Sequence, residues 1–253
     1  MSVTRALFLS RWNGALPEGY QRLYFGAEFC SWAFPSRTQI KAALQAARAA
    51  ELPFTLVTPI LREETLAELR SLFTYLCPQL TSSDELVISD FGTLQLAREL
   101  LPQVEIVVGR ALSGQKRGPR IETLDLAEEA REYFRQGRWY SRESVRLLQE
   151  QGIRRVELDN LLQGVAALPA ELTGSLHTPY AMVTSSRNCP FHPDKSGQRC
   201  ALSCGEVFRL TTPQTSIPLY QAGNSQFLKL DCLPDDLSSL GIDRLVEHID
   251  MPR

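Results

Sequence analysis

Apolar runs of strand length alternate with helical patterns over the first two thirds of the 253-residue sequence, and this alternation constrains the fold most. Repeated βα units favour a parallel sheet. Seven runs are expected to be strands: 6–9, 22–25, 54–59, 85–89, 105–108, 155–158 and 176–183. This number of units predicts an α/β fold, a TIM-barrel-like (β/α) barrel that is complete or partly open, with function at the carboxyl ends of its strands.

The segments between these runs have helical spacing, and the tail is rich in strands. The expected helices are 38–50, 63–76, 93–101, 124–136 and 141–151. Ser141 suits a helix N-cap, and Gly152 suits the position just past a helix end. Extra C-terminal strands are expected at 207–212, 217–221, 227–231 and 244–249, with a Leu-rich helix near 235–240. Without an internal repeat or a low-complexity linker, residues 1–253 are expected to form a single domain whose tail completes the barrel or packs on it.

The charge balance and the cysteine count limit the classes of function. With 27 basic and 29 acidic residues the net charge is -2, so no global field attracts nucleic acid or an anionic membrane. The apolar stretch at the N-terminus is too short for a signal peptide, and no apolar run has the length of a membrane span. We therefore expect a cytoplasmic protein without membrane insertion, in which six cysteines are metal ligands, reactive thiols or buried thiols rather than a disulfide framework.

Three of the cysteines lie in the loop 187–205, in the pattern C-x10-C-x3-C formed by Cys189, Cys200 and Cys204. A loop rich in Gly, Pro and Ser cannot build a hydrophobic core, so a thiolate-bound metal centre would order it. The candidate for a fourth ligand is Cys30, where an apolar run ends in a turn that we expect to be exposed.

The spacing of these cysteines favours an iron–sulfur cluster over zinc. Zinc sites usually take two close cysteine pairs, whereas here one ligand is isolated and another is ten residues from the next. Zinc stays the second interpretation, and purely structural thiols are the third. His192 could replace one cysteine, although a loop histidine beside prolines is more often solvated. Cys77 and Cys232 are expected to be buried free thiols.

Other polar residues give weaker signals. His177, near the end of an expected strand, is interpreted as a core histidine and alternatively as a substrate contact. Glu28, Asp90 and Asp159 also follow or end strand-like runs, but the pattern assigns no catalytic acid or base. The segment 110–120 carries Arg110, Lys116, Arg117 and Arg120 without an acidic neighbour until Glu122. A solvated loop is the favoured interpretation, and a grip on an anionic substrate or an RNA backbone is the alternative.

Four stretches together resemble a known family: Tyr-Phe-Gly-Ala-Glu-Phe-Cys at 24–30, Glu-Leu-Val-Ile-Ser-Asp-Phe-Gly at 85–92, the cysteine loop, and Gly-Ile-Asp-Arg-Leu at 241–245. The sequence is similar to the collagenase-like peptidase family U32. Within it, the pattern is similar to the iron–sulfur subunit of a pair that serves oxygen-independent ubiquinone biosynthesis. The resemblance implies that Cys30, Cys189, Cys200 and Cys204 hold a 4Fe-4S cluster.

The resemblance also implies a function. It suggests a barrel-like protein that works as a heterodimer with a related U32 subunit and hydroxylates an aromatic ring of a ubiquinone precursor without O2, with prephenate as oxygen donor. Relatives suggest alternatives: hydroxylation of tRNA or rRNA bases, a collagenase-like peptidase, or a non-catalytic electron-transfer or structural subunit. A cluster with a cysteine on each corner is coordinatively closed, so it would transfer electrons, sense or stabilise.

Overall fold

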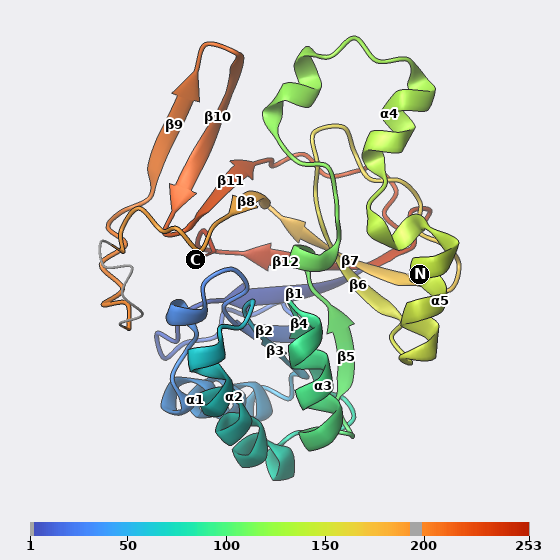
Figure 1. The fold of residues 1–253 in the computed structure, drawn as a ribbon. Coiled ribbons are helices and arrows are strands. Elements are labelled where there is room, and N and C mark those ends of the chain that lie inside the picture. Colours follow the sequence, from blue (N-terminus) through green and yellow to red (C-terminus); the bar gives the residue numbers. More distant parts are fainter. Residues whose placement is uncertain (1–2, 193–198, 253) are drawn as a thin grey trace.

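The computed structural model describes residues 3–192 and 199–252, and its centre is a closed barrel of eight parallel strands (Figure 1). Around the barrel the strand order is β1-β12-β7-β6-β5-β4-β3-β2. The strands are β1 (Thr4–Leu9), β2 (Arg22–Gly26), β3 (Phe54–Val57), β4 (Glu85–Ile88), β5 (Glu105–Val108), β6 (Arg155–Asp159), β7 (Thr173–Thr178) and β12 (Ile242–His248). The predicted TIM-barrel-like α/β fold is confirmed, and the last strand closes it by pairing with β1 and β7.

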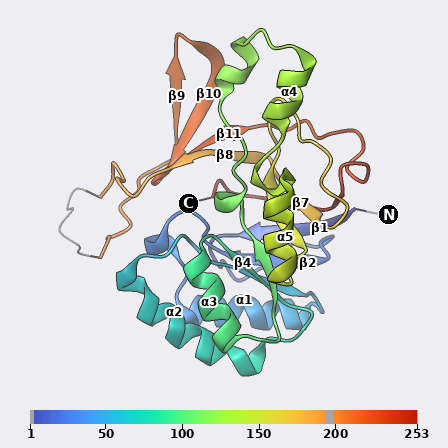
Figure 2. The same ribbon diagram turned by 45° about the vertical axis from the view of Figure 1, so that its right-hand side comes forward.

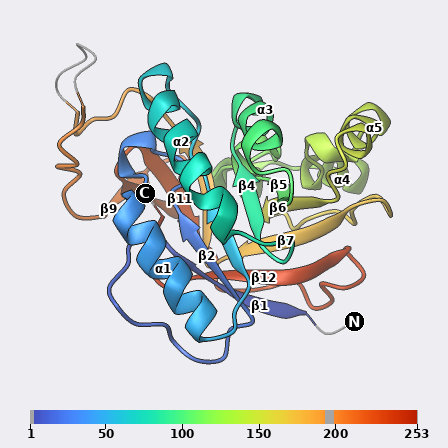
Figure 3. The same cartoon turned by 90° about the horizontal axis from the view of Figure 1, so that it is seen from below.

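Helices cover only part of the barrel. They are α1 (Arg37–Ala49), α2 (Glu63–Leu76), α3 (Phe91–Leu100), α4 (Glu128–Arg135) and α5 (Arg142–Glu150). The first three lie side by side on one side of the barrel (Figures 2 and 3). Local chemistry sets their starts: Ser36 and Gln39 form a capping box, and the side chains of Asp90 and Ser141 accept main-chain N–H bonds. The connections 10–21 and 160–172 contain no α-helix, so the helical ring is incomplete in the described part of the chain.

A second, antiparallel sheet is inserted between β7 and β12. It consists of β8 (Tyr180–Ser185), β9 (Phe208–Thr212), β10 (Thr215–Ala222) and β11 (Ser225–Lys229), in the order β8-β11-β10-β9. The extra C-terminal strands are thereby confirmed. The predicted strand 176–183 was wrong as one element, because it divides between β7 and β8, which belong to different sheets. The division falls at Pro179, and both this residue and Tyr180 are half-buried. Pro179 is a local signal of the division, because a proline donates no main-chain hydrogen bond within a sheet.

The expected helix near 235–240 was also wrong, because these residues form turns. The Asp236 carboxylate accepts bonds from the Ser238 hydroxyl at 2.7 Å and from the Ser239 main-chain N–H at 3.1 Å. Such local side-chain bonds offer the backbone an alternative to helical pairing.

The barrel interior is apolar in one layer and ionic in another. Small and aromatic side chains such as Ala6, Phe8 and Val57 form a buried cluster inside the strands. Next to it, Arg244 on β12 donates two bonds to Glu85 on β4, at 2.7 and 2.9 Å. A larger apolar core, which includes Leu44, packs the outside of the barrel against the helices. No helix among the described residues is long and apolar enough to cross a membrane.

Gly26 ends β2 and lets the chain turn toward Glu28 and Cys30, and we predict that alanine is not tolerated there. Its φ is +151°, and an added Cβ would lie 2.0 Å from the Val57 carbonyl oxygen. Gly118 is a matched control, because its φ is +121° and an added Cβ would meet nothing within 4 Å. Backbone strain of this kind costs about 1–3 kcal/mol. Urea denaturation should show a larger loss of unfolding free energy for Gly26→Ala than for Gly118→Ala; equal losses would contradict the steric argument.

Candidate functional site

The four cysteines singled out by the sequence line one cavity. Cys30 follows β2, Cys189 follows β8, and Cys200 and Cys204 precede β9. Cys204 is buried and the other three are half-buried, so Cys30 is less exposed than its turn suggested. The cavity volume is about 90 Å³, several times the roughly 10–15 Å³ that one water molecule requires. An early segment and a late loop of the chain therefore meet at the carboxyl-terminal edge of the barrel.

Asn224 fastens the two sides of this cavity together. It lies in the turn between β10 and β11, and its side-chain N–H groups donate to the Phe29 carbonyl at 2.8 Å and to the Ser186 carbonyl at 3.1 Å. Phe29 precedes Cys30, and Ser186 lies on the path from β8 to Cys189. One side-chain amide thus joins the segment that carries the early cysteine to the beginning of the late loop.

Main-chain N–H groups face two of the sulfur positions. The Leu202 N–H donates to Cys200 Sγ at 3.4 Å. Burial raises the pKa of the Cys30 thiol, and the main-chain N–H groups of Ala33 and Trp32 oppose this effect. Donors that point at sulfur favour the thiolate and adjust the electronic properties of a bound group.

The lining of the cavity is cationic. Arg62 and Arg187 line it, and no carboxylate occurs among the lining residues that the structure describes. Arg62 lies over the Trp32 ring at 5.4 Å from its centroid and donates to the Arg187 carbonyl at 3.4 Å. Arg187 in turn donates to the Leu61 carbonyl at 3.2 Å, so the two side chains bridge the cysteine loop and the start of α2.

His192 also lines the cavity, and its main-chain N–H donates to the Cys189 carbonyl at 3.2 Å. It is half-buried rather than fully solvated, and its role as a ligand stays a prediction. In residues 3–192 and 199–252, no group of three or more His, Cys, Asp or Glu side chains is arranged to hold a single metal ion.

The other two cysteines lie elsewhere. Cys77 is half-buried where α2 passes into a short 3-10 helix (Cys77–Gln79). Cys232 is exposed, so the expectation of a buried thiol was wrong there. The strand β11 ends at Lys229, earlier than its apolar run suggested, and Cys232 belongs to the following loop.

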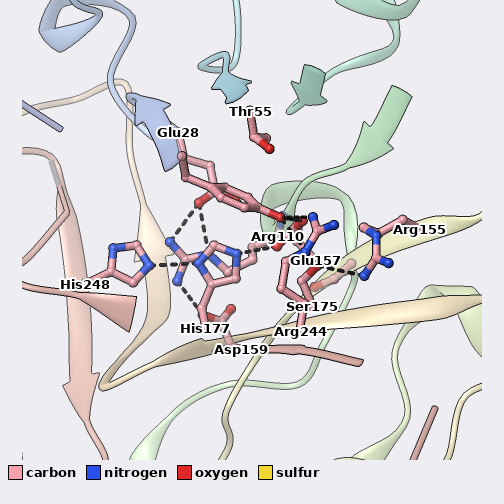
Figure 4. Close-up of polar contacts among 12 residues, drawn as sticks. Glu28, Thr55, Arg110, Arg155, Glu157, Asp159, Ser175, His177, Arg244 and His248 are labelled. Carbon is pink, nitrogen blue, oxygen red and sulfur yellow. Dashed lines mark hydrogen bonds and ion pairs between the residues drawn. The ribbon is translucent and has the colours of Figure 1, made fainter. Parts of the chain in front are cut away.

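Ionic side chains close the carboxyl-terminal mouth of the barrel. Arg110, in a short 3-10 helix (Arg110–Leu112) after β5, donates to Glu28 at 2.7 and 2.9 Å and to Asp159 at 2.9 Å (Figure 4). Arg117 donates to the other oxygen of Asp159 at 2.8 Å. The interpretation of 110–120 as a solvated loop was therefore wrong for Arg110, which is fully buried, and for Arg117.

These ion pairs explain the charge state of Asp159 and hold the second sheet in place. Burial would raise the pKa of Asp159, but Arg117 and Arg110 outweigh burial and keep this pKa below its usual value. The Met182 N–H donates to Asp159 at 2.9 Å, and Arg110 donates to the Tyr180 carbonyl at 3.1 Å. Both partners belong to β8, so the second sheet covers the mouth where barrel proteins usually bind their substrates.

Of the three carboxylates singled out in the sequence, two bind the same arginine and the third, Asp90, lies elsewhere. Glu28 and Asp159 share Arg110, whereas Asp90 accepts bonds from the main-chain N–H groups of Thr93 at 2.7 Å and Leu61 at 2.8 Å. Asp90 therefore caps α3 and anchors the loop after β3.

His177 is a buried histidine with partners on both ring nitrogens, as its core interpretation expected. Nε2 lies 2.5 Å from Glu157 and Nδ1 lies 2.8 Å from His248 Nε2 (Figure 4). Sequence reasoning missed Glu157 and His248. Their signal is the alternation within β6 and β12, which places both side chains on the interior face of the barrel.

The geometry defines an α/β barrel protein with a cysteine-lined cavity at the edge of a closed mouth. The chain is similar to the solved structure of the U32 peptidase Mk0906, with 10% sequence identity and a TM-score of 0.49; the alignment covers 100% of this chain and 95% of that chain. No protein-family profile and no curated protein matches the sequence.

We predict that Arg110 is essential for stability. Replacing it by methionine leaves Glu28 and Asp159 buried without their shared cation, and breaking a buried ion pair in this way costs about 3–5 kcal/mol. The control is Arg120→Met, because Arg120 is exposed in the same segment and surface changes usually stay within about 0.5 kcal/mol. Chemical denaturation at neutral pH measures the unfolding free energy of both variants. A similar small loss in the two would refute the stabilising role of the Arg110 ion pairs.

Proposed function

We propose that this chain is an iron–sulfur protein in which Cys30, Cys189, Cys200 and Cys204 hold a 4Fe-4S cluster. The observation that carries the proposal is that these four thiols, from distant parts of the sequence, line one cavity. Bound there, the cluster would supply one-electron transfer.

The donor set and its surroundings fit such a group. Four cysteines are the usual ligands of a 4Fe-4S cluster, and the cavity is wider than a single ion needs. A cluster with four thiolate ligands is anionic, and Arg62 and Arg187 supply compensating positive charge. Asn224 connects the two sides of the cavity by its hydrogen bonds to the Phe29 and Ser186 carbonyls.

The finer proposal is a role similar to UbiV, paired with a UbiU-like U32 subunit in oxygen-independent hydroxylation of a small aromatic or isoprenoid ubiquinone precursor, with prephenate as oxygen donor. The resemblance of the cysteine pattern supports this role.

The alternatives have weaker support. RNA binding through residues 110–120 would have to use Lys116 and Arg120, since Arg110 and Arg117 are engaged inside the protein. A cysteine peptidase would have to use one of the cavity thiols as its nucleophile. That thiol would then not be available to bind the cluster. If the chain is a non-catalytic electron-transfer or structural subunit, the same cysteines hold the cluster and the partner carries out the whole reaction.

The test of the cluster is metal and sulfide analysis of protein purified without oxygen. We expect about four irons and four sulfides per chain and a visible charge-transfer absorbance. Cys30→Ala should lower both contents and bleach the absorbance, because it removes the one proposed ligand that lies outside the late cysteine loop. Cys77→Ala is the matched control, since Cys77 lies outside the cavity. Stoichiometric zinc without absorbance, or equal iron in both variants, would contradict the proposal.

The cationic lining generates a second prediction, about the reduction potential. Arg62 and Arg187 stabilise the more negative, reduced form of a bound cluster, so Arg62→Gln and Arg187→Gln should each lower its potential. Arg146→Gln is the control, because Arg146 lies on the exposed face of α5. A redox titration followed by electron paramagnetic resonance gives the potentials at equal iron content. A potential that does not move in either cavity variant would show that the two arginines act on the fold alone.

A further inference from the structure

Three buried side chains form a continuous line of hydrogen bonds inside the barrel, apart from the cysteine cavity. Glu157 on β6 contacts His177 on β7 at 2.5 Å, and His177 contacts His248 on β12 at 2.8 Å (Figure 4). The side chain of Glu157 is inaccessible, and the histidines are 2% and 4% exposed. The second ring nitrogen of His248, Nδ1, is buried and has no hydrogen-bond partner in the described part of the chain.

The bonds fix the tautomers of both histidines. Burial lowers the pKa of His177 and the pKa of His248 well below the usual value, so both rings are neutral. Tyr24 donates to the first carboxylate oxygen of Glu157 at 3.0 Å. When Glu157 is ionised, its second oxygen must accept from Nε2–H of His177. The Nδ1 of His177 is then an acceptor, Nε2 of His248 is the donor, and Nδ1 of His248 carries a free lone pair.

Protonation of Glu157 would reverse every bond in the line. A protonated carboxyl donates to Nε2 of His177, so His177 carries its proton on Nδ1 and donates to Nε2 of His248. His248 then carries its proton on Nδ1. The two states of the carboxyl therefore correspond to two tautomeric states of the whole chain of bonds, and in both states the rings remain neutral.

We propose that Glu157, His177 and His248 form a proton relay that takes up a proton at the barrel mouth and stores it on Glu157. A proton released at the mouth binds the lone pair on the buried Nδ1 of His248. The Nε2 proton of His248 moves to Nδ1 of His177, and the Nε2 proton of His177 moves to Glu157. Each ring gains one N–H bond and loses one, and the added positive charge neutralises the carboxylate.

The charged surroundings suit this role near neutral pH. Burial raises the pKa of Glu157 to about 7, while Arg244, Arg155 and Tyr24 oppose that rise. Arg110 at the mouth disfavours a positive charge on either histidine ring. The charged or titratable groups that face the relay from the surrounding elements are Tyr24 on β2, Glu28 after β2, Glu85 on β4, Arg110 after β5, Arg155 and Asp159 on β6, and Arg244 on β12.

The location gives the relay its functional meaning. His248 is the last residue of β12 and His177 is the penultimate residue of β7, so the receiving end lies at the carboxyl ends of the strands, where barrel proteins carry out chemistry. Phe8 stacks on His248 with ring centroids 4.4 Å apart and fixes the ring plane. The relay thus offers a base to a reaction that releases a proton at the mouth, and it does not depend on the cysteine centre.

The test is nitrogen NMR of the full chain labelled with 15N-histidine, recorded over the pH range in which it stays folded. We expect His177 and His248 to change from the Nδ1–H to the Nε2–H tautomer together as pH rises, with one midpoint near 7. The sequence has three histidines, and His192→Gln identifies the signals of the third. Formation of imidazolium on either ring, separate midpoints, or tautomers that never change would overturn the relay.

Two variants separate the relay from a general effect of pH on the fold. Glu157→Gln removes the titrating carboxyl, so the tautomers should no longer depend on pH, with folding checked by circular dichroism. Tyr24→Phe keeps the relay intact but removes a hydrogen bond that favours the ionised carboxylate, so the midpoint should move to higher pH. A midpoint that persists in Glu157→Gln, or that stays in place or falls in Tyr24→Phe, would assign the titration to another group.

Discussion

The ion pairs of Arg110 are the interaction on which the arrangement of this protein depends. A fully buried guanidinium joins Glu28, which follows β2, to Asp159, which ends β6, across the barrel mouth. It also donates to the main chain of β8. Three separate segments are thereby held in one geometry. Because an unpaired charge at this depth is costly, none of the three can leave without the others.

The position of the cysteine cavity follows from these ion pairs of Arg110. Cys30 is two residues after Glu28, and Cys189 lies beyond the end of β8, so both depend on segments that Arg110 fixes. Phe29 belongs to a buried apolar cluster with Met182 and Phe227 at the same junction. Asn224 then completes the connection at the cavity itself. A loop without a core of its own is therefore held from both sides by the barrel and the second sheet.

The polar side chains inside the barrel form two groups at different depths. The pair of Glu85 and Arg244 satisfies two charges deep inside, and the line from Glu157 to His248 leads from that region toward the mouth. Burial keeps the histidines neutral, and the hydrogen bond between the two rings links their tautomers. The proposed cluster would use thiols that follow β2 and β8 and precede β9, whereas the proposed relay uses side chains of β6, β7 and β12.

The sequence by itself determined the types of the elements and the candidate ligands. Helix α2 and strand β5 have the predicted bounds, because helical and strand periodicity are local properties of the chain. The cysteine pattern also selected four cysteines that all line the cavity. Only the tertiary structure decided that the run 176–183 divides between two sheets, that Arg110 is internal, and that Glu157 and His248 meet His177. These outcomes depend on closure of the barrel by β12, which brings distant charges together, and no local spacing encodes which interior side chains will face each other once the barrel is closed.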